Sequence, residues 1–138
     1  MPVDAASGIE IRFADLREML MVTIEQLAEA ALNGESLLLR SLTQDLLREQ
    51  PRLIEYPKPL TSDLRLLAAS ASLVELLALR LRQAPPPWAK DVGALPEPIH
   101  LLKAAASMKR LRELCETEAP EPLLKRGFYA PPNFLEFA

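Results

Sequence analysis

The chain has 138 residues, of which 49% are hydrophobic and 25% are charged. This length and composition fit a single folded domain and exclude wholesale disorder. The net charge of −3 argues against a nucleic-acid-binding protein that works by neutralising phosphates. In the apolar segment 66–81, only residues 66–74 form an uncharged run, far short of the roughly 20 residues that cross a membrane. We therefore expect neither nucleic acid nor a membrane among its partners.

The sequence contains a single cysteine, Cys115, so an internal disulfide is impossible. This favours a reducing compartment, and residues 1–13 lack the basic stretch and apolar run of a secretory signal. The sequence therefore predicts a cytoplasmic protein. The neighbouring acids Glu113, Glu116 and Glu118 would raise the pKa of the Cys115 thiol. This pattern predicts a packed, small apolar residue rather than a nucleophile.

Residues 1–13 are predicted to form an N-terminal arm. The run 8–13 alternates apolar and charged side chains, which is typical of a strand. Ser7 and Glu10, however, have the spacing of a helix capping box, which favours an early helix start. Both alternatives stay open for the arm.

Apolar side chains at three- and four-residue spacing predict helices over about residues 14–32, 35–50 and 62–83. The first is expected to end at Asn33-Gly34, and the second to end before a proline. The third is apolar almost all round, which is typical of the central helix of a bundle.

The third helix has several N-cap candidates, Thr61, Ser62 and Asp63, and its small residues 68–72 would let another backbone approach closely. A fourth helix is predicted over about residues 98–117, because apolar residues form one stripe along it.

Prolines divide the sequence between these helices. There are thirteen prolines and only four glycines, and a Pro-x-Pro-aliphatic pattern occurs at 57–60, 96–99 and 120–123. Because proline is tolerated in the first turn of a helix, each pattern is interpreted as a helix start. The connector 84–98 is also rich in proline, and its Trp88 is expected to pack against the helices.

The C-terminal residues 119–138 are predicted to be an extended tail. Gly127 can end a short turn, and Pro131-Pro132 then prevents any further helix. The tail holds four of the seven aromatic residues, namely Phe128, Tyr129, Phe134 and Phe137. Disordered tails are poor in aromatic residues, so these side chains are predicted to fill grooves between helices of the same chain or of a dimer mate.

Together these elements predict an all-α fold, a compact bundle of about four helices with proline-rich connectors and an extended aromatic C-terminal tail. The predicted parts are the arm 1–13, the helical bundle 14–118, and the tail 119–138, which is docked on the bundle. All three belong to one domain.

Two residues are candidates for a polar ligand-binding site, Glu75 and His100. Glu75 interrupts the apolar third helix, where an arginine from another helix would pair with it and make it structural. His100 is the only histidine and is placed in the first turn of the fourth helix, without a second His or Cys at ligand spacing. No metal site is therefore predicted. The basic runs 109–112 and 125–126 have acids close by and are predicted to be solvated.

No catalytic, nucleotide-binding or zinc-binding motif occurs, so neither catalytic residues nor a cofactor is predicted. The surplus of apolar side chains on the first and third helices predicts a non-enzymatic interaction module, dimeric, that binds a protein partner in the cytosol. The alternative is a small-molecule-binding or enzymatic bundle with a polar site formed by Glu75, His100 and arginines. A helix-turn-helix regulator around Asn33-Gly34 is a third hypothesis, which the acidic balance disfavours.

Overall fold

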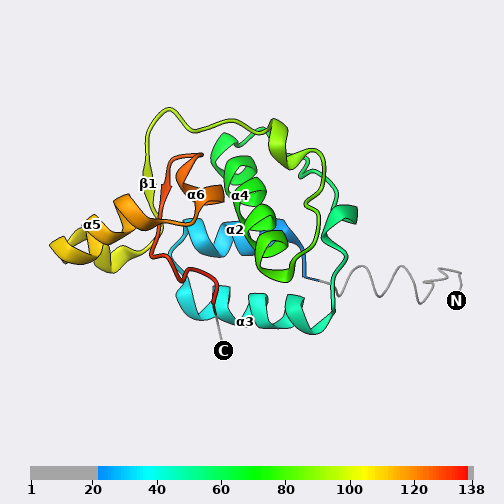
Figure 1. Cartoon of the computed structure of the whole chain (residues 1–138), viewed down its shortest axis with the longest axis horizontal. Helices are drawn as coiled ribbons and strands as arrows, with labels where there is room; N and C mark the ends of the chain where they lie inside the picture. Colours follow the sequence, from blue (N-terminus) through cyan, green and yellow to red (C-terminus); the bar gives the residue numbers. More distant parts are fainter. Residues whose placement is uncertain (1–21, 137–138) are drawn as a thin grey trace, which may run out of the picture.

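The computed structural model describes residues 22–136, and this part of the chain is mostly helical (Figure 1). Its α-helices are α2 (Ile24–Leu32), α3 (Ser36–Arg48), α4 (Leu64–Leu81), α5 (Lys109–Glu118) and α6 (Glu121–Leu124). Three short 3-10 helices connect them, η1 (Leu53–Glu55), η2 (Ala89–Asp91) and η3 (Lys103–Ala106). Two short strands, β1 (Ile99–His100) and β2 (Phe128–Tyr129), complete the described elements.

Helix α4 contacts α2, α6 and η2, and its contact with α2 is the most extensive between any two elements described (Figure 1). Every residue of α4 from 68 to 78 is buried, apart from Glu75. Small buried residues lie on both helices, 68–72 in α4 and Ala28 and Ala31 in α2, and side chains of this size permit close packing. The almost wholly apolar character predicted for this helix therefore reflects contacts on several sides.

Helix α2 begins at a capping box. The Thr23 hydroxyl accepts the Gln26 backbone N–H (3.2 Å), and the Gln26 side chain accepts the Thr23 N–H (3.0 Å). The Thr23 backbone is extended, with φ −96° and ψ 156°, so the prediction of one continuous helix over residues 14–32 is wrong at this residue. The predicted arm 1–13 and the rest of residues 1–21 lie outside the described residues.

Helices α3 and α4 lie within two residues of the boundaries predicted at 35–50 and 62–83. Of the N-cap candidates for α4, Asp63 is the residue that caps it. Its carboxylate accepts the backbone N–H groups of Arg65 (2.9 Å) and Leu66 (3.4 Å).

The helix predicted over residues 98–117 is wrong in its first half. The Ile99 N–H donates to the Gly127 carbonyl oxygen (2.8 Å), and the Leu101 N–H donates to that of Tyr129 (2.9 Å). This stretch therefore forms β1, which pairs in parallel with β2. Backbone hydrogen bonds to a distant segment override the local helical pattern. The α-helix, α5, begins only after η3.

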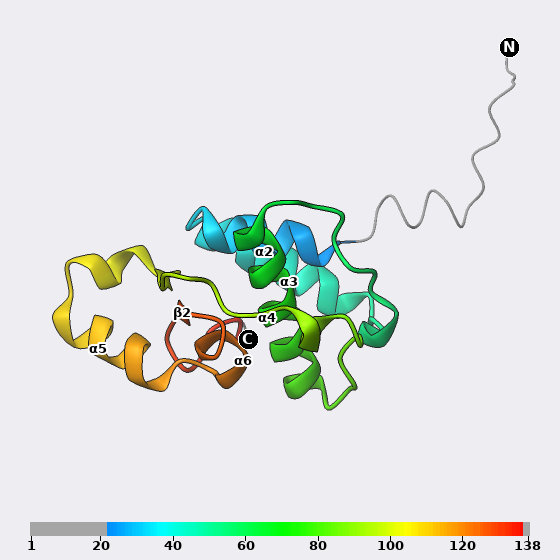
Figure 2. The same ribbon diagram turned by 90° about the horizontal axis from the view of Figure 1, so that it is seen from above.

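The η3–α5 segment stands out from the other elements in two perpendicular views (Figures 1 and 2). Within α5 only Cys115 is buried, and its thiol is free. Burial, followed by the charge of Glu116, raises the pKa of this thiol. The prediction that Cys115 packs as a small apolar residue is confirmed.

After α6 the chain runs beside β1 and then reaches α4. Gly127 has φ +89°, a conformation that favours glycine, and it ends the turn after α6. Phe128 and Leu135 are buried in the core. Arg80 of α4 donates hydrogen bonds to the carbonyl oxygens of Pro132 and Phe134. The described tail is therefore held by both apolar contacts and backbone hydrogen bonds.

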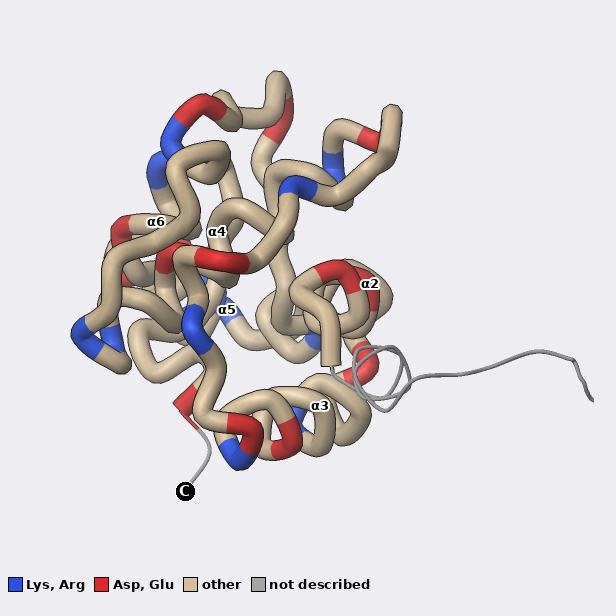
Figure 3. The backbone as a smooth tube through the Cα atoms, turned by 90° about the vertical axis from the view of Figure 1, so that its right-hand side faces the viewer, with Lys and Arg blue, Asp and Glu red and all other residues tan. Residues whose placement is uncertain are grey.

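Along the backbone in the side view, the positions of Lys and Arg are interspersed with those of Asp and Glu (Figure 3). Within residues 22–136, no helix has both the length and the apolar character required to cross a bilayer.

Candidate functional site

Glu75 is the polar exception in the buried stretch of α4, and it pairs with Arg126. The Arg126 Nη1 atom lies 2.6 Å from the Glu75 Oε1 atom, and the Lys125 Nζ atom lies 3.0 Å from the same oxygen. Arg126 is only 1% exposed. The prediction that the run 125–126 is solvated is therefore wrong for Arg126, because Glu75 and nearby carbonyl oxygens replace water around its guanidinium.

The guanidinium of Arg126 is satisfied by backbone as well as by carboxylate. It donates to the carbonyl oxygens of Ala89 (2.7 Å), Val92 (3.1 Å) and Pro122 (3.1 Å). One side chain therefore joins α4, α6 and the connector that contains η2. Such a saturated contact set is typical of a structural ion pair.

Burial alone would raise the pKa of the Glu75 carboxyl, but hydrogen bonds and charges from Arg126 and Lys125 outweigh it and lower the pKa below the usual 4.5. Glu75 is thus an ionised partner at neutral pH. A proton-donating acid in a pocket would need a shift in the opposite direction.

His100 lies in β1 and faces α5. Its Nε2 atom is 3.1 Å from the Glu116 Oε2 atom, and its ring lies 4.9 Å from the Tyr129 ring, centroid to centroid. Within residues 22–136, Glu75 and His100 share no hydrogen-bonding partner. Among the described residues, no group of three His, Cys, Asp or Glu side chains could hold a metal ion.

The predicted tail anchors take different positions. Phe128 is fully buried, whereas Tyr129 is half-buried beside His100. Phe134 is half-buried at the wall of a cavity. Phe137 lies outside the described residues.

The predicted contact of Trp88 with the core is also present. Trp88 packs against the core cluster, and its Nε1–H donates to the Tyr56 carbonyl oxygen (2.8 Å). Burial and the charge of Glu49 raise the pKa of Tyr56 to about 12. Both aromatic residues therefore help to position the proline-rich connectors.

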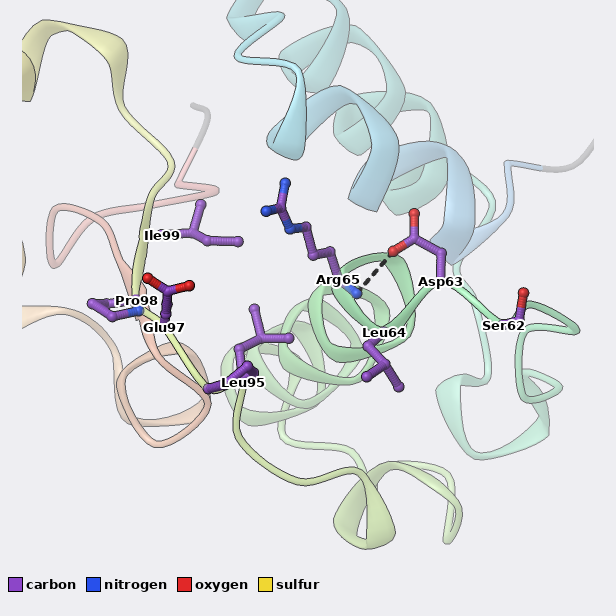
Figure 4. Close-up of a pocket in the computed structure, with 9 residues that line it drawn as sticks. Ser62, Asp63, Leu64, Arg65, Leu95, Glu97, Pro98 and Ile99 are labelled. Carbon is purple, nitrogen blue, oxygen red and sulfur yellow. Dashed lines mark hydrogen bonds between the residues drawn. The ribbon is translucent and has the colours of Figure 1, made fainter.

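A groove of about 530 Å³ lies between the first turn of α4 and the segment that leads into β1. We call it the α4–β1 groove, and its walls are residues 62–65 and 95–99 (Figure 4). Arg65 extends from α4 into the space between the two walls. Apolar side chains and prolines form most of the lining, namely Leu64, Leu95, Pro96, Pro98 and Ile99.

Large apolar side chains are exposed beside this groove. Leu60 is 99% exposed and Leu64 is 67% exposed. Sequence reasoning did not single out either residue, because both stand among prolines and leucines that could equally be core. The one feature of the sequence that could have indicated an exposed leucine was the position of Leu64, in the first turn of a helix that is apolar on nearly every side.

No protein-family model, curated protein or solved structure matches this chain.

Proposed function

We propose that this chain is a non-enzymatic helical interaction module that forms a homodimer through the α4–β1 groove. The exposure of Leu64, which lines the groove, and of Leu60, two residues before its wall, is the observation that supports this most directly. Fully burying a leucine side chain contributes about 1.5–3 kcal/mol. Two leucines from each copy would supply much of the free energy of a small, specific interface.

In this proposal the face pairs with the same face of a second copy. Leu60 is an exposed side chain in the segment that leads directly into one wall of the groove, and the groove is a hollow lined by apolar and polar residues alike. A two-fold axis would insert the leucine of each copy into the groove of the other. Because such an interface uses the same patch twice, it closes as a dimer and does not extend into a filament.

The charged residues at the groove are also compatible with a two-fold arrangement. Arg65 stands on one wall and Glu97 on the other, and neither forms a salt bridge with another residue of the described part. The two-fold axis that buries the leucines would bring Arg65 of one copy toward Glu97 of the other. This pairing would fix the register of the dimer more than its affinity.

The remaining structure serves as the platform for this face. In our proposal the helices form a compact bundle, and the aromatic tail docks on it in the same chain, where Phe128 and Arg80 hold it. We place the dimer in the cytoplasm, because the one cysteine is a free thiol. The assembled dimer would then bind a further protein partner.

Analytical ultracentrifugation of the full chain at micromolar concentrations tests the dimer. We expect a species of twice the 15.4 kDa chain mass. Leu60→Asp should produce monomers, whereas the matched control Leu37→Asp should stay dimeric, since Leu37 is 82% exposed in α3, away from the groove. A wild-type monomer at every concentration, or an undiminished dimer of Leu60→Asp, would overturn the proposal.

A charge-reversal pair tests the arrangement within the dimer. Arg65→Glu and Glu97→Arg should each weaken the dimer, and the double variant should restore it. Failure of the double variant to recover, with both single variants folded by circular dichroism, would contradict the two-fold pairing of these residues.

A further inference from the structure

A second hollow, the α3–η3 cavity, is lined by none of the residues that form the α4–β1 groove. Its volume is about 260 Å³, and it lies between the α2–α3 turn, residues 101–104 and the ring of Phe134. Its buried floor is apolar and consists of Ala30, Ala31, Leu39 and Leu101. The cavity is smaller than the roughly 300–1,000 Å³ that accommodates drug-sized ligands, so its size suits a small metabolite.

The rim of the cavity carries one positive and one negative side chain, Lys103 and Glu35. Neither forms a salt bridge with another residue in the range 22–136. Among the described residues, the Glu35 carboxylate accepts only a long hydrogen bond from the Asn33 side-chain amide (3.4 Å). Two opposite charges thus stand at the mouth of an apolar hollow without satisfying each other.

Gly34 explains how Lys103 reaches this position. The Lys103 side chain crosses directly over Gly34, where a Cβ atom would overlap its methylene groups. Gly34 also has φ +68°, which glycine adopts most readily. The turn between α2 and α3 therefore leaves room for the lysine side chain beside Gly34, the residue that precedes Glu35.

We propose that the α3–η3 cavity binds a free α-amino acid with an apolar side chain. The ligand carboxylate would pair with Lys103, its ammonium group would pair with Glu35, and its side chain would occupy the apolar floor. A zwitterion complements both rim charges at once, whereas a simple anion or cation would pair with one rim charge and be repelled by the other. This assignment uses none of the residues of the proposed dimer interface and does not depend on it.

Phe134 closes one wall of the cavity, and Arg80 positions it. Arg80 donates hydrogen bonds to the backbone of the tail at Pro132 and Phe134, and its Nη2 atom lies 3.4 Å from the Glu136 carboxylate. Removal of the Phe134 ring would enlarge the cavity on that side. The size preference for the ligand side chain should therefore depend on Phe134.

Two-dimensional NMR of the full chain, titrated with L-leucine, tests the assignment. We expect saturable shifts at Gly34 and in residues 101–104. Isocaproate lacks the amine of leucine and isoamylamine lacks the carboxylate, so each should bind more weakly than leucine. L-glutamate should not bind, because its side chain would place a charge on the apolar floor. Equal binding of leucine and isocaproate, or no shifts with leucine at millimolar concentration, would overturn the proposal.

Rim variants provide a second readout. Lys103→Met and Glu35→Gln should each weaken leucine binding roughly two- to fivefold, the range expected for exposed ion pairs. The controls Lys90→Met and Glu25→Gln remove the same charges elsewhere and should bind as the wild type does. Ala104→Phe should block the cavity from its exposed rim without disturbing the core. Leucine binding that survives Ala104→Phe would also overturn the assignment.

Discussion

The guanidinium of Arg126 lies 2.6 Å from the carboxylate of Glu75 and is almost wholly excluded from water. The two residues are 51 positions apart in the chain. Their ion pair fixes α6, and with it the start of β2, against the central helix. This contact locates the C-terminal segment more than any local sequence preference does.

Replacing the arginine tests this role. Arg126→Met should lower the free energy of unfolding by about 3–5 kcal/mol, because it removes the buried partner of the Glu75 carboxylate, which keeps only the more exposed Lys125, and a donor to three carbonyl oxygens. Urea denaturation followed by circular dichroism measures the loss. Lys125→Met is the matched control, and it should cost less than about 1 kcal/mol, since the Lys125 side chain is 43% exposed and water screens its ion pair. Equal losses for the two variants would contradict the structural role of Arg126.

The same ion pair predicts how stability depends on pH. Burial alone would raise the pKa of Glu75, but Arg126 and Lys125 lower it below 4.5 in the folded chain. Its contribution is therefore fully present above pH 4.5 and disappears as the pH falls through the folded-state pKa. The difference in unfolding free energy between wild type and Glu75→Gln should be largest near neutral pH and shrink in acid. A difference that grows on acidification would contradict this sign.

The burial of Phe128 predicts how much the tail contributes to the stability of the fold. Its side chain is fully buried, so Phe128→Ala should cost about 3–5 kcal/mol. Phe134→Ala should cost clearly less, because that ring is only half-buried beside a cavity. Thermal and urea unfolding of the two variants provide the comparison. Similar losses would show that the two rings contribute equally.

The capping box of α2 gives a local prediction. Thr23→Ala removes the hydroxyl that accepts the Gln26 N–H and should lower the unfolding free energy by about 1 kcal/mol. Thr23→Asn retains a cap and should recover most of the loss. An unchanged stability in Thr23→Ala would mean that α2 begins earlier than the structure places it.

Local signals predicted the helices that have their own stops and caps. Asn33-Gly34 and Asp63 mark boundaries that the structure reproduces, because a left-handed glycine and a capping carboxylate act within one turn of the chain. Thr23 is a cap of the same kind, but it was hidden within a longer apolar stripe that continues on both sides of it. Periodicity alone does not reveal such a break.

Long-range contacts account for the features that the sequence did not predict. The helical pattern after Pro98 gives way to β1 because β2, which is remote in sequence, offers hydrogen bonds to its backbone. In the sequence Arg126 follows a lysine in a charged stretch, which predicts a solvated side chain. Its burial depends instead on the position of Glu75 in the folded chain. An arginine partner for Glu75 was predicted, yet nothing in the residue order indicated which arginine it would be.

The parallel pairing of β1 with β2 closes residues 101–127 into a long loop, and the pairing holds the two ends of this loop side by side. Its outer part is η3 and α5, which stand away from the other elements (Figure 2). Lengthening a loop whose ends are already fixed costs little, since closure entropy grows only slowly with length. The exposed turn at Ser107 is thus where a fluorescent or affinity sequence could be inserted while the pairing at its base stays in register.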